Sequence, residues 1–173
     1  RQVNVVQLIS SYRQRGHQKA QLDPLKLQTR EPIPDLDLAF HDLTFADLET
    51  QFQVGSLHIG KSTATLGEIV GSLEKTYCNT VGAEFMHIVD SQQQHWIMNR
   101  MESVRSSPVL DEAQKMQILR RLIKAEGLEK SLASKYPGTK RFGLEGGESL
   151  IPCLDELIQR AGSYGAKEIV LGM

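Results

Sequence analysis

The chain has 173 residues, of which 20 are Lys or Arg and 21 are Asp or Glu, and its formal net charge is -1. This length allows one domain, or one domain and part of another, and the balanced charge lacks the basic patch of a nucleic-acid-binding protein. Because no apolar run reaches the roughly 18 residues of a membrane span and the first residues do not resemble a signal peptide, we expect a cytoplasmic protein with neither a membrane nor a nucleic acid as partner.

The first predicted element is a helix near the start of the chain. Apolar residues recur at helical spacing from Val3 to Tyr12, and Gly16 follows two arginines as a helix end commonly does. Residues 17–43 contain three prolines and show no sustained period. We therefore expect a helix that ends at Gly16, followed by a long ordered loop.

Two threonines, each three positions before a carboxylate, predict the next helices. Thr44 and Thr65 both stand at the start of an apolar pattern, and the second forms a capping box with a glutamate. Helices are expected near 44–51 and over 66–77. The mostly apolar run at 81–89 is ambiguous between a strand and an extended buried segment.

Helical patterns dominate the second half of the chain. Ser91 begins one predicted helix, Asp111 begins another that ends before Gly127, and residues 128–136 form a third. The large apolar residues of the first of these helices are assigned to the core, namely Trp96, Met98 and Met101.

The last part of the chain predicts a turn, a helix and a strand. The turn lies at the glycine pair 146–147, the helix runs over 150–162, and the apolar residues 167–173 have the composition of a strand buried on both faces. No second confident strand is predicted, and an unpaired buried strand is costly. The strand therefore either pairs with 81–89 or belongs to a larger α/β domain.

No short sequence motif identifies a catalytic, phosphate-binding or metal site. The glycine pair meets no phosphate-loop pattern, so a helix-entry turn is favoured, and no histidine stands in a zinc or protease motif. His17 with Asp35 and Asp37 is a conceivable divalent-cation site, although a histidine beside a helix end and two solvated acids is favoured. Cys78 and Cys153 lack zinc-ligand spacing and read as reduced, buried thiols.

Four longer strings carry more information than these short motifs. They are RGHQKAQLDPL at 15–25, FHDLT at 40–44, LGEIVGSLEKTYCNTVGAEFMHI at 66–88 and KRFGLEGGESLIPCLDELI at 140–158. Together, and in this order, they resemble the thiamine-dependent decarboxylating component of the 2-oxoglutarate dehydrogenase complex. In that family a strand that ends in Gly-Met is followed by a His-Arg-Gly-Arg run. The present sequence ends in the same Gly-Met pair, at Met173.

The resemblance implies a mainly α fold. Residues 1–139 would form a helical N-terminal region containing the long loop near 17–43. Residues 140–173 would form the entry into a truncated α/β thiamine-binding domain, and the terminal strand would belong to that missing domain.

The resemblance also implies a function for the full-length protein. It would decarboxylate 2-oxoglutarate with thiamine diphosphate and Mg2+, then transfer the succinyl unit to the lipoyl group of an acyltransferase in the tricarboxylic acid cycle. Its partners would be a second copy of itself, the lipoyl-bearing succinyltransferase and dihydrolipoamide dehydrogenase, and a eukaryotic member would lie in the mitochondrial matrix. A 2-oxoadipate-type sister enzyme and a non-catalytic helical interaction module remain alternatives.

Few site residues carry over from the family. Its catalytic histidines and its diphosphate and metal ligands match no residue here, so the fragment alone is expected to be inactive and to bind no cofactor. Phe142 could line the substrate pocket and Glu145 could orient the turn, although a core role for Phe142 is favoured. His17, Asp35 and Asp37 resemble a calcium site of vertebrate members, with a longer spacing and one acidic residue missing.

Overall fold

The structure is a computed structural model that describes residues 1–27 and 29–172. It divides into two compact units, Arg1–Pro108 and Val109–Met173. The boundary between the two units falls after Pro108. The boundary expected at 139/140 is of another kind, because it marks the start of a catalytic domain, and it stays a prediction. Each unit is described by itself below.

The first unit contains three α-helices and one small sheet in its described residues. In chain order these are α1 (Gln2–Lys19), three short 3-10 turns, β1 (Gln51–Gln53), β2 (Thr63–Thr65), α2 (Leu66–Tyr77) and α3 (Ser91–Glu102). The 3-10 turns are η1 (Pro34–Leu36), η2 (Leu38–His41) and η3 (Phe45–Asp47). The strands pair antiparallel, with Phe52 opposite Ala64.

The second unit is a helical hairpin formed by α4 (Glu112–Lys135) and α5 (Leu150–Ser163). With 53% of its residues in helices, the structure confirms the mainly α class. No helix in the described part of the chain is long and apolar enough to cross a bilayer.

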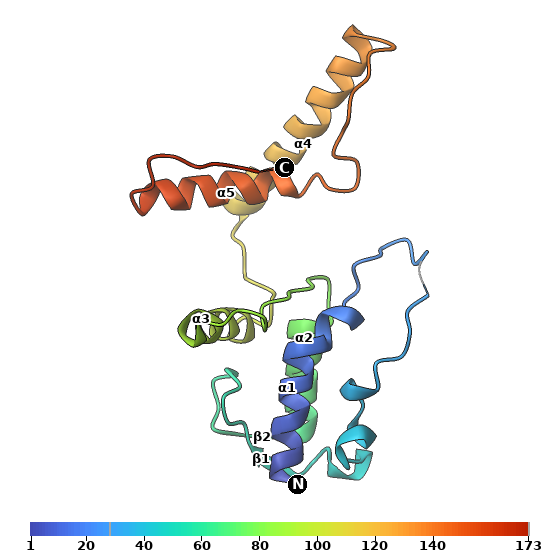
Figure 1. Cartoon of the computed structure of the whole chain (residues 1–173), viewed down its shortest axis with the longest axis vertical. Coiled ribbons are helices and arrows are strands. Elements are labelled where there is room, and N and C mark those ends of the chain that lie inside the picture. Colours follow the sequence, from blue (N-terminus) through green and yellow to red (C-terminus); the bar gives the residue numbers. More distant parts are fainter. Residues whose placement is uncertain (28, 173) are drawn as a thin grey trace. The chain divides into compact units, whose positions relative to one another are not determined.

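The core of the first unit lies where α1 packs against α2 (Figure 1). The apolar stripe of α1 and that of α2 supply fully buried side chains, among them Val5, Leu8, Tyr12, Leu66, Ile69 and Leu73. The predicted capping box begins α2 as expected, because the Thr65 amide donates to Glu68 at 3.0 Å and the Glu68 amide donates to the Thr65 hydroxyl at 3.1 Å.

The expectation that Gly16 ends the first helix is wrong. The helix continues to Lys19, and Gly16 is buried against α2. A Cβ atom at this position would lie 2.5 Å from the Cβ of Tyr77. Gly16 is therefore required by the close approach of two helices, and not by a helix end.

Two further helix predictions need correction. At 44–51 only the 3-10 turn η3 forms, because the next residues join the sheet as β1 and the Leu48 carbonyl accepts from the Gly67 amide at 2.9 Å. The two helices expected on either side of Gly127 are one continuous helix, α4. An isolated glycine weakens a long helix by only about 1 kcal/mol, which is too little to end it.

The predicted terminal strand is not formed in the described residues. Residues 167–172 belong to no helix or strand, and Met173 lies outside the described residues. The run 81–89 also forms no strand, so the two segments do not pair, although Phe85 is buried. A strand needs a partner for its backbone groups, and the described residues provide none for this segment.

The core assignments on α3 are partly confirmed. Met98 is 4% exposed and Met101 packs against the core, but Trp96 is 67% exposed. Trp96 therefore lies on the solvent face of a helix whose apolar side is already filled.

Candidate functional site

The helical hairpin of the second unit encloses the candidate binding site. Asp111 caps α4 by accepting from the Gln114 amide at 2.8 Å, and Gln114 accepts in return from the Asp111 amide at 3.0 Å. A turn at Gly146, with φ +88°, leads into α5 at Ser149. Residues at both helix starts, Gln114 and Ser149, line the same cavity.

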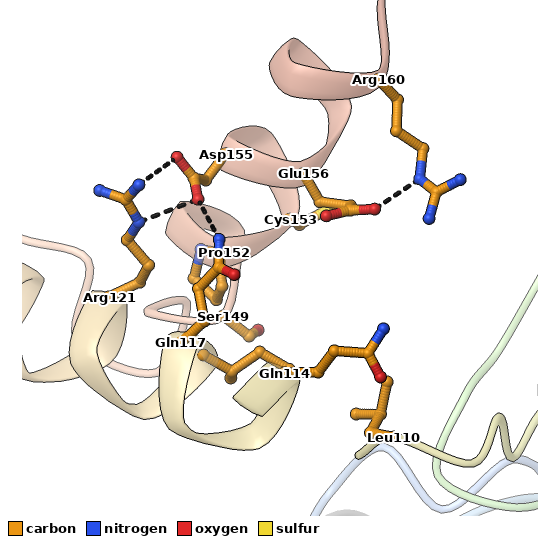
Figure 2. Close-up of a pocket in the computed structure, with 11 residues that line it drawn as sticks. Leu110, Gln114, Gln117, Arg121, Ser149, Pro152, Cys153, Asp155, Glu156 and Arg160 are labelled. Carbon is orange, nitrogen blue, oxygen red and sulfur yellow. Dashed lines mark hydrogen bonds and ion pairs between the residues drawn. The ribbon is translucent and has the colours of Figure 1, made fainter. Parts of the chain in front are cut away.

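A cavity of about 420 Å³ lies between the two helices (Figure 2). Residues three and four apart on α4 share one face, and this face lines one wall. The lining residues are Leu110, Gln114, Gln117, Ile118, Arg121, Ser149, Pro152, Cys153, Asp155, Glu156 and Arg160. The cavity is of the size that small-molecule sites commonly have.

The charged side chains at this cavity neutralise one another. Arg121 and Asp155 form a two-point ion pair, with Nη2–Oδ1 at 2.8 Å and Nε–Oδ2 at 2.9 Å, and Gln159 adds a hydrogen bond to the same carboxylate at 3.0 Å. Arg160 is paired with Glu156 on α5 (Figure 2). The site thus offers apolar walls and hydrogen-bonding groups, which suit binding better than proton transfer or nucleophilic attack.

The two cysteines occupy opposite environments, so the expectation that both are buried is wrong for one of them. Cys153 is exposed at the cavity, whereas Cys78, at the C-terminal end of α2, is 6% exposed, and both are free thiols. Burial raises the pKa of Cys78 to about 11. At neutral pH the Cys78 side chain therefore remains a protonated thiol.

We expect one fast and one slow thiol in the folded chain. At pH 8 a disulfide reagent such as DTNB should modify Cys153 rapidly and Cys78 only as the first unit opens, because the thiolate is the reactive form and burial suppresses it. Time-resolved absorbance of the wild type, Cys153→Ser and Cys78→Ser assigns the two phases. A fast phase that survives in Cys153→Ser would contradict the prediction.

A buried polar cluster holds the first unit together. The Glu102 carboxylate accepts from Arg13 Nε at 2.8 Å, from the Tyr77 hydroxyl at 2.7 Å and from the His58 amide at 2.9 Å. Arg13 also donates to the Ser56 carbonyl at 2.8 Å. Burial, and next the charge of Glu102, raise the pKa of Tyr77, so its hydroxyl remains a donor. Three helices and the β1–β2 loop meet at this carboxylate.

Phe142 lies neither in the core nor in the α4–α5 cavity. It is fully exposed, at 101%, so the favoured alternative of a core role is wrong in the described structure. Its assignment to a substrate pocket stays a prediction. Glu145 forms no hydrogen bond in the described structure, whereas Glu148 accepts from the Gly146 amide at 3.1 Å.

Two of the three cation-site candidates are paired with other side chains. His17 Nε2 lies 3.6 Å from a Glu84 carboxylate oxygen, and Asp35 lies 3.3 Å from Arg15 Nε. Asp37 precedes η2. Among residues 1–27 and 29–172, no three His, Cys, Asp or Glu side chains are grouped as metal ligands would be.

Sequence reasoning missed the cavity residues and the Glu102 cluster. Arg121 and Asp155 are 34 positions apart, and Arg13 and Glu102 are 89 apart. The helical spacing of Gln114, Gln117 and Arg121 is visible in the sequence, but their partners are not.

Comparison with known proteins identifies relatives over the whole chain. No family model matches it. It is 59% identical over 173 residues to the "2-oxoglutarate dehydrogenase E1 component" of Azotobacter vinelandii and 50% identical over 173 residues to that of Cupriavidus necator. The protein of the same name from Haemophilus influenzae is 39% identical over 99% of the chain. The chain spans only 18% of the length of each of these relatives.

Proposed function

We propose that this chain serves as the helical N-terminal region of a 2-oxoglutarate dehydrogenase E1 component. The chain belongs to the family of these proteins, as a homologue of their N-terminal part. The observation that carries the proposal is the 59% identity to the Azotobacter vinelandii protein over all 173 residues. The names of the relatives favour 2-oxoglutarate over 2-oxoadipate as the substrate of the whole protein.

The whole protein would decarboxylate 2-oxoglutarate with thiamine diphosphate and Mg2+ and pass the succinyl unit to a lipoyl group. Thiamine diphosphate would supply the electron sink for decarboxylation. Its partners would be a second copy of itself, the lipoyl-bearing succinyltransferase and dihydrolipoamide dehydrogenase.

The described residues of this chain offer no ligand set that fits the cofactor. A diphosphate bound through Mg2+ needs oxygen ligands for the metal, and the described residues hold no group of three potential metal ligands. The α4–α5 cavity has its charges paired internally, as described above. We therefore assign the chain a supporting role in the fold of the enzyme, and we derive no catalytic step from its residues.

Deletion of the gene that encodes this chain tests the proposal. Cell extracts of the deletion strain should lose CoA-dependent reduction of NAD by 2-oxoglutarate. The full reading frame should restore this activity, whereas the 173 residues alone should not. Extracts that retain the activity after deletion, in a cell with no second copy of the gene, would contradict the proposed function.

A further inference from the structure

A second cavity, of about 240 Å³, lies on the solvent-facing side of α2 in the first unit. Three segments supply its walls: the β1–β2 loop with Lys61, the face of α2 that carries Gly71 and Lys75, and the residues after α3 with Arg105. None of these side chains takes part in the Glu102 cluster. The cavity is small, and its most prominent feature is its charge.

Positive charge exceeds negative charge in the lining of this cavity. Three cations, Lys61, Lys75 and Arg105, face one carboxylate, Glu68, which leaves an excess of two positive charges. Lys61 Nζ lies 2.6 Å from a Glu68 carboxylate oxygen. Lys75 and Arg105 form no ion pair with any carboxylate in the described part of the chain. Two cations beside one cavity are therefore left without a counter-charge.

The backbone and one hydroxyl hold Arg105 at this position. Arg105 and Ser106 both adopt left-handed backbone conformations, with φ of 50° and 49°, directly after α3. Such conformations are uncommon for residues other than glycine. Arg105 Nε lies 3.4 Å from the hydroxyl of Ser72, a buried residue of α2. The guanidinium is thereby directed toward α2 and keeps its other donors available.

Gly71 keeps the helix surface open at the cavity. Glycine is among the least favourable residues inside a helix. A Cβ added at Gly71 would meet no atom within 4 Å, in contrast to Gly16, where Tyr77 leaves no room. Packing within the described chain therefore does not require a glycine at this position, whereas close approach of a ligand to the helix backbone would.

We propose that this cavity binds a small oxyanion with two negative charges, of the phosphate type. Such a ligand would neutralise the excess of two positive charges. The guanidinium and ammonium groups would donate hydrogen bonds to its oxygens, and these charge-assisted bonds are among the strongest in proteins. The volume suits inorganic phosphate or a small phosphorylated metabolite better than a nucleotide. This inference does not depend on the proposed enzymatic function.

Calorimetric titration of the 173-residue chain with inorganic phosphate at low ionic strength tests the proposal. We expect saturable binding with one site per chain. The double variant Lys75→Gln with Arg105→Gln should bind phosphate at least about tenfold more weakly, because two charge-assisted contacts are lost. The control Lys115→Gln removes a lysine of α4 that forms no ion pair among the described residues, and it should leave the affinity unchanged.

A second variant should strengthen binding. Glu68→Gln removes the single negative charge from the cavity lining, and glutamine can keep the capping hydrogen bond to the Thr65 amide. Phosphate should then bind several-fold more tightly, a gain that misfolding cannot produce. Absence of saturable phosphate binding to the wild type, or equal affinity in the wild type and both variants, would overturn the proposal.

Discussion

A chain carrying Glu102→Leu is expected to lose about 3 to 5 kcal/mol of its free energy of unfolding, because the substitution leaves a buried cation without its partner. The side chain of Glu102 is 0% exposed and that of Arg13 is 9% exposed. Leucine would also leave the Tyr77 hydroxyl and the His58 amide without their acceptor. Urea denaturation followed by circular dichroism measures the loss.

Two further variants distinguish the effect of the unpaired buried charge on the free energy of unfolding from the effect of exchanging a glutamate for a leucine. Glu49→Leu makes the same exchange at an exposed glutamate and should change the free energy of unfolding by no more than about 0.5 kcal/mol. Replacing both partners, Arg13→Met with Glu102→Leu, should recover part of the loss, since no charge remains buried. If Glu102→Leu behaves like Glu49→Leu, the cluster does not stabilise the unit.

Gly16→Ala should destabilise the chain although alanine is the better helix former. The added Cβ would lie 2.5 Å from the Cβ of Tyr77, which is fixed to the backbone of α2 and cannot rotate away. The two helices must separate, and overpacking of this kind costs about 1 to 3 kcal/mol. Thermal unfolding of the variant and the wild type, monitored by circular dichroism, measures the effect.

Gly71→Ala is the matched control for this prediction. Gly71 also lies in a helix, but an added Cβ meets no atom within 4 Å. This variant should therefore gain stability, by up to about 1 kcal/mol from helix propensity. The same Gly→Ala substitution should thus lower the stability at Gly16 and raise it at Gly71. A stability gain in Gly16→Ala would contradict the packing described for α1 and α2.

Local signals in the sequence predict much of the helical structure. The Thr65 capping box and the apolar stripe that follows it define α2, and α3 and α5 also lie where their patterns place them. The errors arise where distant residues decide the structure. Gly16 reads as a helix end until Tyr77 of α2 is brought against it, and 44–51 reads as a helix until β1 pairs with β2.

The candidate sites were less predictable than the fold. The α4–α5 cavity and the cavity beside α2 each depend on side chains from separate segments. In the second, Lys61 and Arg105 lie close together, and this proximity leaves no local pattern in the sequence. The family strings direct attention to Phe142, which is fully exposed in the described structure. The resemblance predicted the relatives correctly. The role that it implies for Phe142 in a substrate pocket stays a prediction.

In the proposed function, the chain supports a thiamine-dependent decarboxylase of 2-oxoglutarate without being one itself. The most direct measurement is CO2 release from 2-oxoglutarate and from 2-oxoadipate by the purified product of the full reading frame, with and without thiamine diphosphate and Mg2+. The 173-residue chain serves as the control. We predict cofactor-dependent release with a preference for 2-oxoglutarate, and none from the chain alone. Release by the chain alone, or no release from either acid by the full-length protein, would contradict the proposed function.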